Sequence, residues 1–126
     1  MHVYTIEGDA IESMDDFWRE IGRAINGPGG YFGRNFDALN DCLRGGFGTP
    51  DEPFEIRWAN SARSKEALSW EETVRYLERR LKGAHPSNHE RIRREIASAR
   101  DGTGPTLFDM VVEMIEQSRN ANLVLE

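Results

Sequence analysis

The feature that most constrains the fold is the wide spacing of three short strand patterns along the chain. They lie at residues 3–6, 54–58 and 122–125, and the second alternates apolar and polar residues as a half-buried strand does. Long segments with helical periodicity separate them. Strands joined by crossover helices pair in parallel. We therefore expect an α/β fold in which a small parallel sheet is packed with helices.

Helix starts can be placed from polar residues that precede apolar-periodic runs. The predicted N-caps are Ser13, Asn35, Ser69, Ser87 and Thr106. Glu follows Ser69 and Ser87 at the third position, and Asp follows Ser13 and Thr106 there, as in a capping box. A shorter helical stretch is expected over residues 61–68. The pattern contains no repeat and no second domain.

Length, charge and cysteine content narrow the class of protein. The 126 residues suit a single domain over 1–126. The lone Cys42 cannot form an internal disulfide, and we expect it to be buried beside Leu39. The N-terminus does not resemble a signal peptide and no apolar run spans a bilayer, so we expect a cytoplasmic protein that binds no membrane. A net charge of −6 argues against nucleic-acid binding and favours a basic partner, although acidity also serves solubility.

The helix expected at residues 36–43 has two distinct faces. At 100° per residue, Phe36, Leu39 and Leu43 fall on one stripe, which must dock on the core because so short a helix is unstable alone. The opposite stripe, facing outward, comprises Asp37, Asn40, Asp41 and Arg44.

The outward carboxylates have two interpretations. Asp37 lies at the positive end of the helix dipole, whereas Asp41 lies nearer the negative end and has only Arg44, three residues on, as local compensation. One interpretation is a solvated acidic face with one weak ion pair. The other is that a cationic partner supplies the missing charge.

A longer motif surrounds this helix. Residues 31–43 read Tyr-Phe-Gly-Arg-Asn-Phe-Asp-Ala-Leu-Asn-Asp-Cys-Leu. This run resembles the signature of the barstar family, the barnase inhibitors, whose pattern is Tyr-Tyr-Gly-x-Asn-Leu-Asp-Ala-Leu-x-Asp-Cys-Leu. The resemblance covers roughly residues 3–68 and 106–126, so the helical pair at about 69–100 looks like an insertion. It implies a barstar-like three-stranded parallel sheet packed with helices.

The resemblance also implies a function and a set of contact residues. The chain would be an inhibitor, not an enzyme, and would block the active site of a small basic extracellular ribonuclease of the guanyl-specific type. Asp41 would enter the phosphate-binding pocket, where its carboxylate stands in for a substrate phosphate. Secondary ion pairs would come from Asp37 and Glu113. Tyr31 would pack on the catalytic histidine of the nuclease, and Asn35 and Gly45 would supply hydrogen bonds and close approach.

Four positions depart from the family pattern while remaining on or near the expected binding face. Asn40 stands where the family can carry Trp, Arg44 replaces a small polar residue, Gly46 replaces an aromatic residue with Phe47 one place later, and Arg34 replaces an acidic residue. Loss of aromatic anchors changes hot-spot chemistry.

Two other functions remain open. One is a binding or immunity module for another basic toxin, and the other is a carboxylate-based hydrolase that would use Asp37 and Asp41. No catalytic residue, metal ligand set or cofactor site is predicted. His85 and His89 are four residues apart, but Pro86 and the predicted cap at Ser87 separate them.

Overall fold

Three parallel strands form the sheet. A computed structural model describes residues 1–126 and places β1 at His2–Glu7, β2 at Phe54–Ala59 and β3 at Ala121–Leu125. The strand order is β1-β2-β3, with both neighbouring pairs parallel. The α/β fold class with a three-stranded parallel sheet is confirmed, and each strand begins at or one residue before its predicted start.

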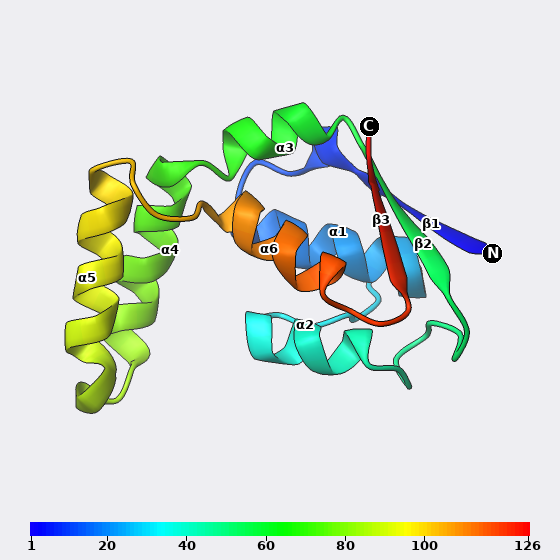
Figure 1. The fold of residues 1–126 in the computed structure, drawn as a ribbon, viewed down its shortest axis with the longest axis horizontal. Helices are drawn as coiled ribbons and strands as arrows, with labels where there is room; N and C mark the ends of the chain where they lie inside the picture. The colour runs from blue at the N-terminus through cyan, green and yellow to red at the C-terminus, as the bar shows by residue number, and fades with distance from the viewer.

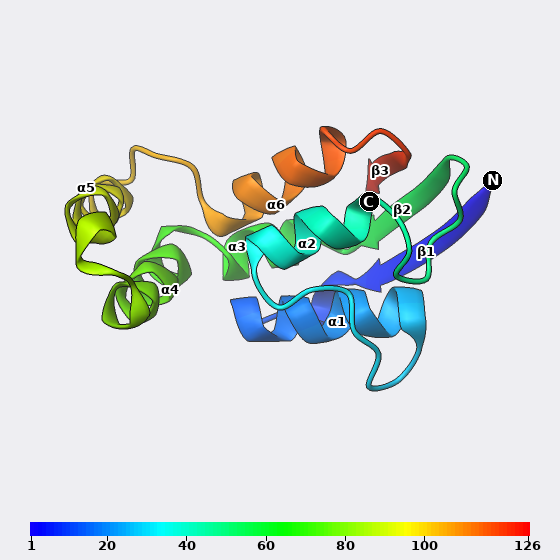
Figure 2. The ribbon, with the colours of Figure 1, turned by 90° about the horizontal axis from the view of Figure 1, so that it is seen from below.

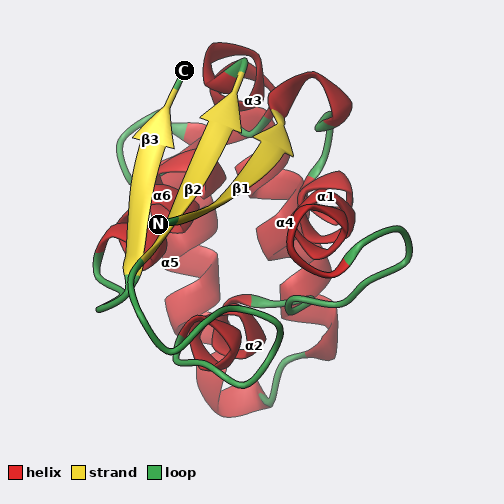
Figure 3. Ribbon diagram, turned by 90° about the vertical axis from the view of Figure 1, so that its right-hand side faces the viewer, coloured by secondary structure: helices red, strands yellow, loops and turns green.

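The sheet has one covered face. Along β1 the side chains of Tyr4 and Ile6 are buried while that of Thr5 is exposed, and on β2 Ile56 and Trp58 are buried. Such alternation follows from the two-residue period of a strand. In Figure 3 the strands face the viewer, with α6 behind them, α1 to their right and α2 below them.

Six α-helices connect the strands. Their bounds are α1 Met14–Asn26, α2 Phe36–Leu43, α3 Ser61–Ala67, α4 Trp70–Gly83, α5 His89–Arg100 and α6 Leu107–Glu116. In Figure 1, α1 and α6 lie beside the sheet, with α3 above and α2 below them, and α4 and α5 form a separate pair at the far left. None of these helices is both long and apolar enough to cross a bilayer.

Three of the predicted caps are confirmed. The Oγ of Ser13 accepts a hydrogen bond from the backbone N–H of Asp16 at 3.2 Å, and the Oδ1 of Asn35 accepts one from that of Ala38 at 2.8 Å. Thr106 and Asp109 form a complete capping box, with both reciprocal hydrogen bonds at 3.1 Å.

The predicted start of α4 after Ser69 is confirmed, whereas the predicted cap at Ser87 is wrong. The side chain of Ser69 makes no capping bond. Glu72, the other member of the expected capping box, accepts a hydrogen bond from the backbone N–H of Met14 at 2.8 Å. Ser87 lies inside a 3₁₀ turn, Pro86–Asn88, and α5 begins only at His89.

The main core lies between the sheet and helices α1, α2, α3 and α6. Its largest fully buried side chains include Trp58, Phe17, Phe32 and Phe54. Trp58 stacks on Phe17 at a ring-centroid distance of 5.4 Å, and its indole N–H donates to the Oγ of Ser64 at 3.0 Å. These contacts join β2 to α1 and α3 in one core.

Helices α4 and α5 form a hairpin with a small core of its own. That core comprises Leu77, Ile92, Ile96 and Ala99. The two ends of the hairpin meet, because the backbone N–H of Phe108 donates to the carbonyl of Leu68 at 3.3 Å. The chain therefore leaves the main core and returns to it at one place (Figures 1 and 2).

Candidate partner-binding face

Helix α2 is seated by its apolar stripe, as expected. Leu39, Cys42 and Leu43 are buried in the main core. The preceding loop approaches the helix closely at Gly33, whose φ is +94° and where a Cβ would lie 2.7 Å from the backbone nitrogen of Leu39. Only glycine fits both conditions. The loop and the cap at Asn35 therefore fix where α2 begins.

The opposite stripe of α2 carries exposed carboxylates. The side chain of Asp41 is 68% exposed, and its only ion pair joins its Oδ1 to the Nη1 of Arg44 at 3.9 Å. Asp37 is exposed and takes part in none of the ion pairs of the chain. An exposed pair at that distance contributes about 1 kcal/mol at most. Ion pairs within the chain therefore compensate the carboxylates of α2 only weakly.

Unlike the exposed carboxylates of α2, the neighbouring Cys42 thiol is buried. Cys42 is buried, as the sequence predicts, and it lies next to Asp41. Burial and, to a smaller extent, the charge of Asp41 raise the pKa of the Cys42 thiol. The side chain is a small core residue and not a reactive group on this face.

Two exposed aromatic side chains meet beside α2. Tyr31, before the helix, and Phe47, after it, are each 44% exposed, and their ring centroids lie 6.4 Å apart. The side-chain amide of Asn26 donates to the backbone carbonyls of both residues at 2.7 Å. One amide thus ties together the two loops that flank the helix. Phe47 was not among the predicted contact residues; its position one place after the expected aromatic was the available signal.

The loop after α2 is built from glycine. Gly45 and Gly46 have φ values of +120° and +87°, and space around the Cβ position of Gly46 is empty. Exposed backbone at these positions is open to close approach by another molecule. Gly45 and Gly46 lead into Phe47, so this loop, Tyr31 and α2 belong to one continuous surface.

A groove of about 1210 Å³ lies between α2 and α6. We call it the α2–α6 groove. It is lined by Phe36, Asn40, Leu43, Arg44, Arg80, Met110, Glu113, Met114, Gln117, Ser118, Arg119 and Asn120. The structure thus brings Glu113 of α6 to the same groove as Asn40 and Arg44 of α2. Neither Asp37 nor Asp41 lines it, so the pair of carboxylates is not housed in this cavity as a hydrolase site would be.

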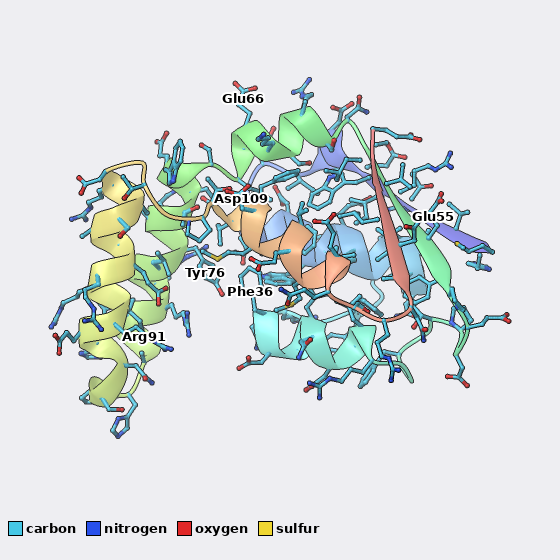
Figure 4. The ribbon with its side chains drawn as sticks, viewed as in Figure 1. Phe36, Glu55, Glu66, Tyr76, Arg91 and Asp109 are labelled. Atoms are coloured by element: carbon cyan, nitrogen blue, oxygen red, sulfur yellow. The ribbon has the colours of Figure 1, made fainter.

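The α4–α5 hairpin reaches the start of α2 through one aromatic contact. Tyr76 of α4 packs edge-to-face on Phe36 with a centroid distance of 6.0 Å, and the two labelled side chains lie together in Figure 4. Burial raises the pKa of Tyr76; Arg80 and Arg79 oppose that change, and the charge of Asp37 adds to it. The hairpin therefore brings the charges of Arg79 and Arg80 close to Asp37 of α2.

Comparison with known proteins identifies the family. The sequence profile of the family described as Barstar (barnase inhibitor) matches residues 1–99. No curated protein sequence matches the chain. The matched residues contain α2 and its flanking loops but not Glu113. Members of this family are ribonuclease inhibitors rather than enzymes. By this match over most of its length, the chain belongs to the barstar family.

Proposed function

We propose that this chain inhibits a small, basic, secreted ribonuclease of the guanyl-specific type by covering its active site with α2 and the adjacent loop. The observation that carries the proposal is the exposed, poorly compensated carboxylate of Asp41, which is 68% exposed and has one ion pair at 3.9 Å. Asp41 lies in the last turn of α2, where the helix dipole does not stabilise a negative charge. A cationic pocket would stabilise it through charge-assisted hydrogen bonds.

The chemistry of a ribonuclease active site suits this carboxylate. Such a site binds a phosphate with cationic groups, and a carboxylate presents two oxygen acceptors to the same donors. Close charge pairs of this kind couple by about 1.5–7 kcal/mol, a range that comes from the barnase–barstar complex itself and not from this chain. We propose that Asp37 and Glu113 add ion pairs at the sides of the same pocket.

The remaining contact residues would act through shape and hydrogen bonding. The Oδ1 of Asn35 is used by the helix cap, so its side-chain amide group is the part left to donate to the nuclease. We propose that Tyr31 stacks on a ring of the partner, and that Gly45 and Gly46 allow its backbone to approach. Asn40 and Arg44 line the α2–α6 groove, and we propose that they contact the nuclease at its edge.

The location of the protein follows from this role. An inhibitor of a secreted ribonuclease protects cellular RNA from the copies that have not left the cell. The proposal therefore includes a cytoplasmic location and a protein partner, with no cofactor.

Single carboxylate truncations test the proposal. Inhibition constants against barnase and a panel of other small secreted ribonucleases are measured for Asp41→Ala, Asp37→Ala and Glu113→Ala. Asp41→Ala is expected to weaken inhibition most, since Asp41 has the least local compensation, and the fold is expected to survive because the side chain faces outward. Glu116→Ala is the matched control, because Glu116 is an exposed carboxylate of α6 that does not line the groove. Equal, small losses for the three variants would rule out a central Asp41.

A further inference from the structure

The hairpin changes the distribution of charge over the molecule. Residues 69–101 hold eight of the 16 basic residues but only six of the 22 acidic ones, so this segment carries a net charge of +2 while the rest of the chain carries −8. The ion pairs of the hairpin use Arg75, Arg79, Arg91 and Arg100. Arg80 forms none of them, and it is the hairpin residue that lines the α2–α6 groove.

The groove itself is cationic although it adjoins an acidic helix. Its charged lining consists of Arg44, Arg80 and Arg119 against Glu113 alone. Arg80 and Arg119 have no ion pair in the chain, and Arg44 has only the 3.9 Å pair with Asp41. These three arginines project from three different helices or loops, so the positive charge is a property of the assembled groove.

The wall that carries Arg80 is held firmly. At the first turn of α4, the carboxylate of Glu72 accepts from the backbone N–H of Met14 at 2.8 Å, and the Oγ1 of Thr73 accepts from the backbone N–H of Leu107 at 3.0 Å. One turn later Tyr76 packs on Phe36. Arg80 follows Tyr76 by four residues and therefore lies on the same side of α4. The contacts of α4 therefore fix the backbone of Arg80 beside α2 in the free protein.

Apolar side chains line the same groove. They are Phe36, Leu43, Met110 and Met114. Methionine side chains are flexible and polarisable, which suits an adaptable binding surface. An occupant with both a negative charge and an apolar side chain would match the arginines and this apolar lining.

We propose that the α2–α6 groove is a second contact region for the same ribonuclease, and that it takes an acidic segment of that protein carrying an apolar side chain. The inference rests on the proposed function and deepens it. The partner would present charges of opposite sign side by side: cationic groups of the active site for Asp41, Asp37 and Glu113, and an acidic segment for Arg80 and Arg119. Specificity arises because a ribonuclease with a cation in place of that segment would be repelled.

Charge reversal in the groove tests this inference with the full chain. Inhibition constants are measured against the same ribonuclease panel for Arg80→Glu, with Arg93→Glu as the matched control. Arg93 is an exposed, unpaired arginine that lines a different hollow, between α4 and α5. For each ribonuclease inhibited in an Asp41-dependent manner, Arg80→Glu is expected to raise the inhibition constant at least about tenfold, the lower end of the barnase–barstar range, while Arg93→Glu leaves it unchanged. Arg80→Ala, with a smaller loss, and unchanged thermal midpoints guard against an effect of misfolding.

The outcomes separate the two proposals. If Asp41→Ala weakens inhibition and Arg80→Glu does not, the groove inference is overturned and the inhibitor function stands. If the chain inhibits no ribonuclease, the inhibitor function fails. A direct titration then tests whether the α2–α6 groove binds an acidic, apolar segment.

That titration uses the ¹⁵N-labelled chain with a short synthetic peptide of alternating Glu and Leu, its Lys-Leu counterpart, and a short single-stranded RNA. The acidic peptide is expected to shift backbone signals of residues lining the groove, and Arg80→Glu is expected to weaken that binding at least about tenfold. Equal binding of the Lys-Leu peptide would overturn the inference. Binding of the RNA at the same signals would overturn it in favour of a phosphate site.

Discussion

The buried carboxylate of Glu72 is expected to attach the hairpin to the core. Its side chain is 4% exposed, and it accepts a hydrogen bond from the backbone N–H of Met14 at 2.8 Å and another from the Nε of Arg75 at 2.9 Å. Glu72→Ala removes the acceptor of an N–H in the first turn of α1. That N–H is then left without a partner in the interior.

The size of the loss follows from these two contacts. A hydrogen bond to a charged group contributes about 1.5–3 kcal/mol, and an unsatisfied buried donor costs a comparable amount. Because Arg75 is 56% exposed, its pair adds at most about 1 kcal/mol. Glu72→Ala is therefore expected to lower the free energy of unfolding by about 2–4 kcal/mol.

The neighbouring residue supplies a matched control. Glu71 is 86% exposed and pairs with the same Arg75 at 3.2 Å, but it touches no core backbone. Glu71→Ala is expected to cost less than about 1 kcal/mol. Urea unfolding followed by tryptophan fluorescence measures both variants. Equal losses for the two variants, or a Glu72→Ala loss below about 1 kcal/mol, would refute the assignment of Glu72 as the attachment point.

Three further predictions concern the binding face. The Cys42 thiol should react slowly with a thiol reagent in the native protein and rapidly in urea, where it is no longer buried. Because burial raises the pKa of this thiol in the folded state, the free energy of unfolding should also fall as the pH rises above the ordinary pKa of a thiol. Phe47→Ala should weaken ribonuclease inhibition by about 1 kcal/mol or more, as inhibition constants would show. Asn26→Ala should also weaken inhibition, because the amide that holds the loops of Tyr31 and Phe47 together is lost while both aromatic side chains remain. Stopped-flow association with an inhibited ribonuclease should slow strongly with added salt while dissociation changes little. Arg34→Ala should speed association, because Arg34 is an exposed cation outside the groove. An association rate indifferent to salt would contradict steering by α2.

Local signals predicted the parts of the fold that depend on neighbours in the chain. Asn35 and Thr106 cap their helices as expected, since their hydrogen-bond partners are three residues away. The stripes of α2 were also predictable, because helical periodicity fixes which residues face inward. Ser69 precedes α4 as expected, but its capping box does not form, and Glu72 accepts from a backbone N–H far away in the sequence.

The proposed binding face also combines features that depend on neighbours in the chain with features that depend on distant residues. Asp37 and Asp41 could be predicted to face outward from their spacing alone. The contact of Tyr31 with Phe47 depends on two loops that Asn26 holds together, and no pattern in the sequence encodes that bridge. The place of Arg80 depends on how α4 is docked, which only the assembled core determines.

The meeting of Leu68 and Phe108 has a consequence for how sequences on this fold can diverge. The backbones of these residues are joined by a hydrogen bond of 3.3 Å, so everything between them is a side branch whose ends are already closed. The entropy cost of such a loop grows only slowly with its length, by about 0.6 kcal/mol per doubling. Helices can be lengthened, replaced or deleted there without rerouting the strands. The contribution to partner selectivity that we propose for Arg80 lies on this branch, so it can change while the strands keep their path.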